Sequence, residues 1–243
     1  MNATYLRMEI MRLYRNRRVL IFSILMPTLL LLILGSLYKQ DSLNGASVKA
    51  YLMVSMGLFG SMSAAIGSGG TIAVERGIGW NRQLRLTPLH PGSYVLTKVV
   101  LSLVMALPPL LVTHAVGALA LHVRLPMTTW LLVMAGSWLG ALPFAALGLV
   151  VGYMAKPDSV QQVSGLLFFL LALFGGIWVP VEQMPSVMHR IAEWTPAYWV
   201  GQVARSPLFH HAVSQQAIWI ILAWTAGLGV VALGRFRADT ARA

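Results

Sequence analysis

Long uncharged stretches of apolar residues alternate along this sequence with short segments that carry nearly all of its charge. Two of them, Ala50–Val74 and Val99–Val123, are each 25 residues long and contain no Asp, Glu, Lys or Arg. About 20 apolar residues in a helix are enough to cross the hydrocarbon core of a bilayer. The pattern therefore predicts an all-α membrane protein in which residues 1–243 form a single transmembrane domain. Its six transmembrane helices are expected at about 19–38, 50–74, 95–121, 128–155, 159–179 and 217–234.

The composition excludes several other classes of protein. Only 10% of the residues are charged and the mean hydropathy is +0.71, whereas a soluble domain carries about 25% charged residues. The formal net charge of +11 falls between the apolar runs. This placement indicates that the cations orient the chain in the membrane and lie near anionic lipid head groups. It predicts no nucleic-acid partner. Because the chain has no Cys, disulfides, thiolate zinc sites and Cys nucleophiles are excluded.

The cations also predict the orientation of the chain. If the N-terminus is inside, 13 of the 18 Lys and Arg residues lie in cytoplasmic segments, as the positive-inside rule requires. We therefore expect a multi-pass protein of the cell membrane with both termini in the cytoplasm. Residues 75–98 then face the cytoplasm between the second and third spans, and residues 180–215 lie on the outer side between the fifth and sixth.

Residues 1–18 precede the first span and are expected to form an amphipathic interfacial helix. Leu6, Ile10 and Leu13 share one side of a helix by their spacing, and Arg12 falls on another. Such a helix suits the anionic inner leaflet. The alternative is a plain basic flank that only fixes the topology.

Residues 175–206 are expected to form a re-entrant helical hairpin that acts as an outer gate. Gly175 and Gly176 end the fifth span, and prolines divide the rest of the segment into two pieces too short to cross a bilayer. Aromatic residues at these positions favour the membrane interface. The alternative is a surface loop with an ordinary aromatic belt. The further candidate residues of this segment are Pro180, Pro185, Trp194, Pro196 and Tyr198.

The cytoplasmic segment 75–93 contains a second short predicted helix, Ile78–Leu86. Trp80 and Leu84 share one face of it, and Pro88 ends it. An exposed aromatic residue beside arginines is typical of a binding surface. The alternative is an Arg-rich loop that only sets the topology.

Sequence motifs for catalysis and for metal binding are missing. His210–His211 has no partner at metal-ligand spacing, and the glycine-rich residues 67–71 lack the Lys of a phosphate loop. We therefore expect no catalytic residue, no metal site and no cofactor on this chain. Small residues recur four apart, as at Gly148 and Gly152, which allows close packing of helices within one chain or between two.

Several motifs resemble one known family. The sequence resembles permease subunits of ATP-binding-cassette (ABC) type 2 exporters, in the drug and antibiotic efflux subgroup. The motifs that carry the resemblance are Glu-Arg-Gly at 75–77, Leu84, Thr-Pro-Leu at 87–89 and Lys98 at the start of the next span. The late Gly-Gly-Ile-Trp-Val-Pro run and the six spans add to the resemblance, although the charged run before Gly77 is shorter than is common in that family. The resemblance implies a cytoplasmic coupling helix that docks on an ATPase. Its residues would be Glu75, Arg76, Gly77, Trp80, Leu84, Arg85, Thr87, Pro88 and Leu89.

The resemblance also implies partners. These are a second copy of the chain and two separate ABC ATPase subunits, which would bind ATP and Mg²⁺. The apolar spans favour an amphiphilic drug, antibiotic or lipid-like substrate moved out of the cell. Three alternatives remain: an ABC exporter of a polysaccharide or glycolipid, a stand-alone secondary transporter or channel, and an intramembrane lipid enzyme.

Overall fold

The chain is a bundle of helices, and the all-α prediction is confirmed. The computed structural model describes Met11 and residues 17–38, 42–43, 46–79, 91–178 and 184–241. Its strands are an antiparallel pair of two residues each, β1 (Ser42–Leu43) and β2 (Ala46–Ser47), with Ser42 opposite Ser47. The helices are α2 (Arg17–Leu37), α3 (Val48–Gly77), α5 (Pro91–Leu119), α6 (Met127–Leu139), α7 (Leu142–Met154), α8 (Val160–Phe174), α9 (Ser186–Glu193), α10 (Pro196–Arg205), the 3₁₀ helix η2 (Ser206–Phe209) and α11 (Gln215–Ala241).

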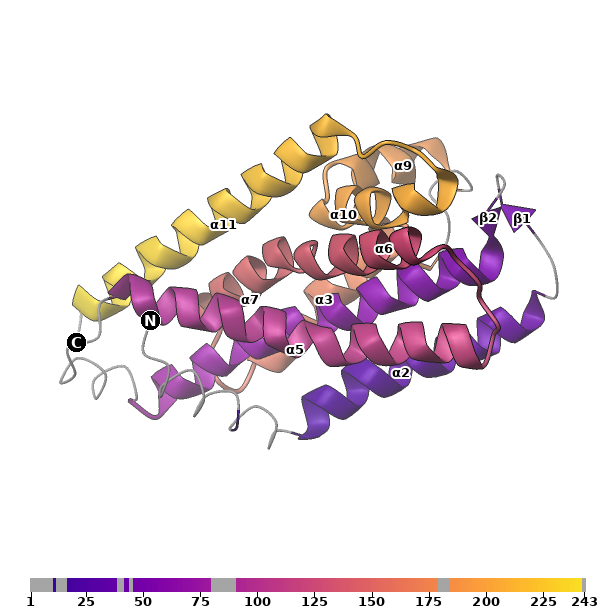
Figure 1. Cartoon of the computed structure of the whole chain (residues 1–243). Coiled ribbons are helices and arrows are strands. Elements are labelled where there is room, and N and C mark those ends of the chain that lie inside the picture. Colours follow the sequence, from indigo (N-terminus) through magenta and orange to yellow (C-terminus); the bar gives the residue numbers. More distant parts are fainter. Residues whose placement is uncertain are drawn as a thin grey trace.

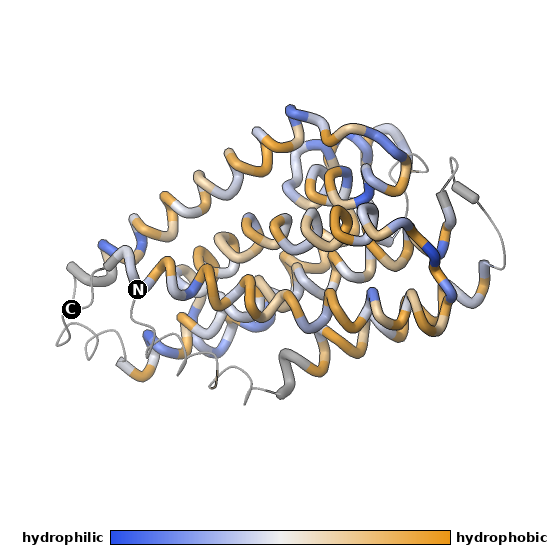
Figure 2. The backbone as a smooth tube through the Cα atoms, in the orientation of Figure 1, coloured by the Kyte–Doolittle hydropathy of each residue, from blue (hydrophilic) through white to orange (hydrophobic). Residues whose placement is uncertain are grey.

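Four helical stretches within the described residues are long and apolar enough to cross a membrane: 48–77, 92–119, 127–154 and 215–238. Figure 2 shows hydrophobic residues along most of the length of these helices. The apolar parts of the first and fifth predicted spans, 21–37 and 160–174, are shorter. Helix α8, with its 15 residues, extends over only about 22 Å, less than the hydrocarbon core of about 30 Å. The number of six spans therefore stays a prediction.

Helix α3 forms the centre of the bundle. It packs against α2, α5, α7 and α8, and most of its residues are buried, with Met56 and Met62 fully enclosed. Helix α11 instead lies along one side and leaves most of its surface exposed (Figure 1). The helix with the lowest hydropathy of the four long stretches is thus the one most covered by protein.

The predicted fourth span is interrupted near its middle. Helices α6 and α7 meet at Gly140 and Ala141, where the Ala141 amide donates to the carbonyl of Trp138, three residues back. Pro143 follows in the first turn of α7. Because proline has no backbone N–H, it removes one bond of the regular helical pattern. The span predicted within 128–155 therefore consists of two consecutive helical segments of 13 residues each.

The small residues of the spans pack helices of this one chain together. Gly69 of α3 faces Gly148 of α7 so closely that a side-chain carbon at Gly69 would collide with the α7 backbone. A carbon added at Gly148 would lie 2.7 Å from the carbonyl oxygen of Ile66. The α3–α7 contact is thus backbone against backbone, as small residues allow in membrane helices.

The bundle has two distinct ends. The C-terminal ends of α3 and α11 and the N-terminal end of α5 lie together at one end, on the left in Figure 1. Helices α9 and α10 lie at the other end. The chain between α3 and α5, which contains most of the predicted coupling residues, therefore leaves and re-enters the bundle at the same end.

The α3–α7 contact makes a prediction about stability. Replacing Gly69 with Ala forces the two backbones apart and should lower the free energy of unfolding by about 1–3 kcal/mol, the usual cost of overpacking. The matched control is Gly165→Ala on α8, where an added carbon meets no atom within 4 Å. The control should be neutral or slightly stabilising. Unfolding of both variants in mixed micelles measures the difference, and equal effects would contradict the contact.

Candidate functional site

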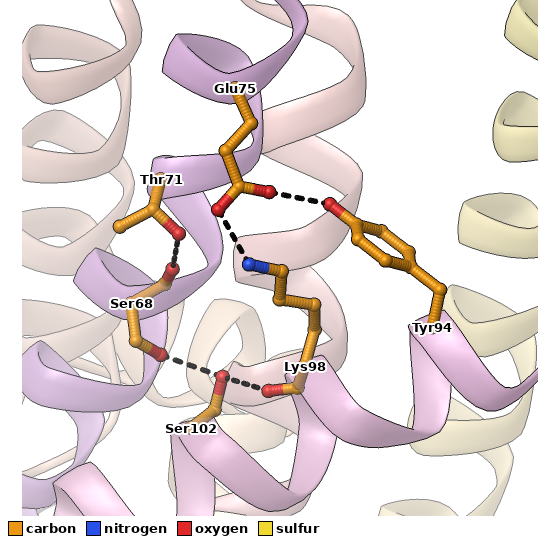
Figure 3. A network of polar contacts seen from close by, with 6 residues as sticks. All are labelled: Ser68, Thr71, Glu75, Tyr94, Lys98 and Ser102. Carbon is orange, nitrogen blue, oxygen red and sulfur yellow. Dashed lines mark hydrogen bonds and ion pairs between the residues drawn. The ribbon is translucent and has the colours of Figure 1, made fainter. Parts of the chain in front are cut away.

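A buried ion pair joins α3 to α5 at the end of the bundle where the predicted coupling segment begins. Glu75 lies in the last turn of α3 and Lys98 about two turns into α5, and both side chains are 1% exposed. The Lys98 Nζ lies 2.6 Å from Glu75 Oε1 (Figure 3). This distance is that of a short, charge-assisted hydrogen bond. The pair brings together two residues 23 positions apart in the sequence.

Tyr94 forms a hydrogen bond with the second oxygen of the same carboxylate. Its hydroxyl donates to Glu75 Oε2 at 2.7 Å, and it lies one turn before Lys98 on the same face of α5. The Tyr94 ring stacks on Phe236 of α11 with 5.6 Å between the ring centroids. Phe236 in turn meets the ring of Tyr153 from α7. The carboxylate of α3 is therefore linked through one tyrosine to α5, α7 and α11.

A pair of hydroxyls continues the contact between α3 and α5 deeper into the bundle. The Ser68 hydroxyl donates to Ser102 Oγ at 2.6 Å, and Ser102 donates to the backbone carbonyl of Lys98 at 2.9 Å. Both serines are buried. Figure 3 shows this pair on the same side of the two helices as the ion pair. Polar contacts thus hold α3 and α5 together over about two turns.

Arg76 ties the end of α3 to the end of α7. Its Nη1 donates to the backbone carbonyls of Tyr153 at 2.7 Å and Gly152 at 3.4 Å. These carbonyls belong to the last turn of α7, where acceptors lack helical partners. A cation at that position also opposes the negative end of the helix dipole.

The polar contacts described at this site connect helices of the bundle. Groups of three His, Asp or Glu side chains that could hold a metal ion are absent from the described part of the chain. What the geometry provides is a neutral, enclosed connection between helices. Removing one partner of such a buried pair typically costs about 3–5 kcal/mol, because the remaining charge is left without compensation.

Comparison with known proteins identifies the family. Residues 3–209 match the family described as "ABC-2 type transporter". The chain belongs to this family. It is also 33% identical over 199 residues to "Putative transport permease YvfS" of Bacillus subtilis (strain 168), which covers 81% of this chain and 80% of that protein.

Family membership confirms the resemblance and the coarse function expected from the sequence. The ABC-2 protein is a multi-pass membrane protein and a permease subunit of an ABC transporter. It is a transport subunit rather than a catalytic one, and it works with ABC ATPase subunits in the membrane. The polar site at the ends of α3 and α5 therefore belongs to a permease subunit.

The predicted coupling residues fall partly within the described structure. Glu75 is enclosed by its own chain, Arg76 binds the end of α7, and Gly77 is the last residue of α3. Their contact with an ATPase stays a prediction. The remaining predicted coupling residues, Trp80, Leu84, Arg85, Thr87, Pro88 and Leu89, lie outside the described residues.

The predicted outer gate contains two short helices. Pro185 and Pro196 stand at the starts of α9 and α10. Gly175 and Gly176 follow α8, and Gly176 adopts a left-handed φ of 68° that favours glycine. Tyr198 meets the ring of His189, which joins α10 to α9, whereas Trp194 is 81% exposed. A re-entrant position in the bilayer stays a prediction.

The other residues predicted for the gate and for the interfacial helix have no described position. Pro180 of the gate lies outside the described residues. So do the interfacial residues Leu6, Ile10, Arg12 and Leu13.

The role of Lys98 was missed in the sequence. The positive-inside pattern places Lys98 among the cytoplasmic charges, whereas α5 begins at Pro91, earlier than the predicted 95, and Lys98 is buried in the bundle. The role of Tyr94 was missed as well. A usable signal was present, because a cation within a predicted span needs a partner, and Glu75 is the nearest preceding carboxylate in the sequence.

A double-mutant cycle tests the ion pair. Lys98→Met and Glu75→Gln should each lower the free energy of unfolding by about 3–5 kcal/mol, because each leaves one buried charge unpaired. The double variant removes both charges and should cost clearly less than the sum of the two. Unfolding in mixed micelles gives the three values.

The matched control for this cycle is Lys156→Met, at an exposed position between α7 and α8. It removes the same charge from the surface and should change stability by no more than about 0.5 kcal/mol. Strictly additive costs at positions 75 and 98 would show that the two side chains do not interact.

Proposed function

We propose that this ABC-2 permease exports an amphiphilic drug, antibiotic or lipid-like substrate with energy from a separate ATPase. The functional unit would contain two copies of the chain and two ATPase subunits, which bind ATP and Mg²⁺. The buried Glu75–Lys98 pair is the observation that carries the proposal. The pair joins the two helices, α3 and α5, between which lies the segment that would receive the force of the ATPase.

The mechanism follows from how the two helices are joined. Residues 78–90 would dock on the ATPase and be displaced when ATP binds. Because the ion pair and the Ser68–Ser102 contact hold α3 to α5, a push on the segment would move both helices as one body. Arg76 and Tyr94 would pass part of the motion to α7 and α11.

A groove beside α11 supports the class of substrate. It has a volume of about 950 Å³ and lies between α11 and the α9–α10 pair. Its walls include Trp194, Trp199 and Trp224 together with the carboxylate-bearing Glu193. Aromatic walls with a few polar groups are typical of sites for drug-sized ligands. The aliphatic residues Ile220, Leu228 and Val231 in the same wall suit the apolar part of an amphiphile.

Loss of ATPase binding tests the docking role. The double variant Trp80→Ala/Arg85→Glu should insert into the membrane normally but lose its ATPase subunit on purification and lose ATP-dependent transport of a fluorescent amphiphile. Removing the aromatic anchor and reversing the charge would take away the main contacts of the docking surface.

The matched control carries the same two kinds of substitution at the opposite end of the bundle, Trp194→Ala/Arg190→Glu on exposed residues at α9. This control should keep the ATPase subunit bound. Undiminished ATPase co-purification with the Trp80→Ala/Arg85→Glu variant would contradict the docking role.

A further inference from the structure

Arg205, the last residue of α10, is a buried cation whose partners among the described residues are neutral. Its side chain is enclosed, at 4% exposure. Its Nη1 donates to Ser55 Oγ and to the Gly176 carbonyl, both at 3.3 Å, and its Cζ stands 4.9 Å from the centre of the Tyr51 ring. Within the described part of the chain, no carboxylate forms an ion pair with it. Lys98, by contrast, has a carboxylate at 2.6 Å.

A cavity adjoins this guanidinium. It has a volume of about 220 Å³ and lies where α10, η2 and the start of α11 meet the first turn of α3. Its wall includes Arg205, Gln202, Ser206, His211, Ser214 and Tyr51, and none of the described residues that line it is an Asp or Glu. The polar groups are therefore mainly donors, or side chains that can act as donors, around one permanent positive charge.

We propose that this cavity binds the anionic head group of an amphiphile, a phosphate or a carboxylate, against Arg205. The site lies at the end of the bundle away from the coupling segment (Figure 1). It does not depend on the proposed export function, because a resident lipid and a transported amphiphile would present the same chemistry.

The hydrogen bonds of Arg205 leave donors for such a ligand. A guanidinium has five N–H donors in a planar fork, and the bonds it makes to the described residues use Nη1 alone. Both bonds are also longer than the 2.7–2.9 Å or so that is typical of a charge-assisted bond. An anion in the cavity would meet the remaining donors in the two-point geometry that arginine favours for phosphate and carboxylate.

Burial of the charge gives a physical reason for the ligand. An unpaired charge in a low-dielectric interior is costly, and the ring of Tyr51 offsets only part of that cost. Gly201 leaves space for the guanidinium beside its own helix, because a side-chain carbon there would lie 2.6 Å from Nη2. The arrangement places the positive charge beside the cavity while keeping it out of bulk solvent.

The size of the cavity limits what enters it. A volume of about 220 Å³ is below the roughly 300–1,000 Å³ of sites that enclose a whole drug-sized ligand. A head group fits, and the apolar chains of the amphiphile would extend outside, along the surface of the bundle. This argues for an anchored head group rather than for full enclosure of a substrate.

Binding to the purified full-length chain in a non-ionic detergent tests the site. The probe is dioctanoyl phosphatidylglycerol, and dioctanoylglycerol is the uncharged probe with the same chains. Native mass spectrometry gives the affinities. We expect the phosphate-bearing probe to bind at least about tenfold more tightly, the difference expected for charge-assisted hydrogen bonds.

The decisive variant is Gln202→Glu, which places a carboxylate in the cavity wall beside Arg205. It should reduce binding of phosphatidylglycerol about tenfold or more. Because Gln202 is only half-buried, the variant is expected to fold. The control Gln161→Glu makes the same change at an exposed residue of α8 and should leave binding unchanged. Arg205→Lys, which keeps the charge but loses the fork, should retain part of the affinity.

Inorganic phosphate distinguishes the source of the ligand. If millimolar phosphate displaces the lipid, the anion alone is sufficient for recognition, and if it does not, the site requires a lipid-borne head group. Both results support the proposal. Equal binding of the charged and uncharged probes, or full binding by Gln202→Glu, would overturn it.

Discussion

The buried ion pair between Glu75 and Lys98 is the interaction on which the arrangement of this bundle most depends. Neither charge is tolerable alone in an apolar interior, so each fixes the position of the other. The pair sets how far α3 and α5 slide along one another and which faces they turn inward. Tyr94 and Arg76 extend the connection to α11 and α7. The chain that links α3 to α5 therefore begins and ends on helices that are already joined.

Helix α3 connects this end of the bundle to the other. Near its N-terminal end, Tyr51 and Ser55 contact Arg205 of α10, and near its C-terminal end Glu75 contacts α5. Between these points Gly69 packs directly on the α7 backbone. A helix held at both ends and closely packed along its length transmits displacement rather than absorbing it. The proposed coupling segment and the proposed anion site therefore lie at opposite ends of one central helix.

Local signals in the sequence predicted the helices but not their connections. The uncharged runs marked the long helices, and Pro185 and Pro196 marked the two short ones, because both signals act within a few neighbouring residues. The Glu75–Lys98 pair requires a contact over 23 positions, which only the packing of α3 against α5 creates. The burial of Arg205 likewise depends on contacts with Ser55 and Gly176, which are distant in the sequence. The interruption between α6 and α7 had a local signal in Pro143, which the long apolar run concealed.

We infer that α3 and α5 move as one body when the ATPase acts. The chain has no Cys, so spin labels can be attached to cysteines introduced at Val74 and Leu96, which are 45% and 52% exposed on the two helices. Pulsed electron–electron double resonance measures the distance between the labels in the complete transporter. It is recorded in two states, without nucleotide and after trapping with ATP and vanadate. We predict the same mean and width in both states, with a broader distribution once Lys98→Met breaks the ion pair. A change in the mean distance between the two states of the unaltered pair would contradict the claim.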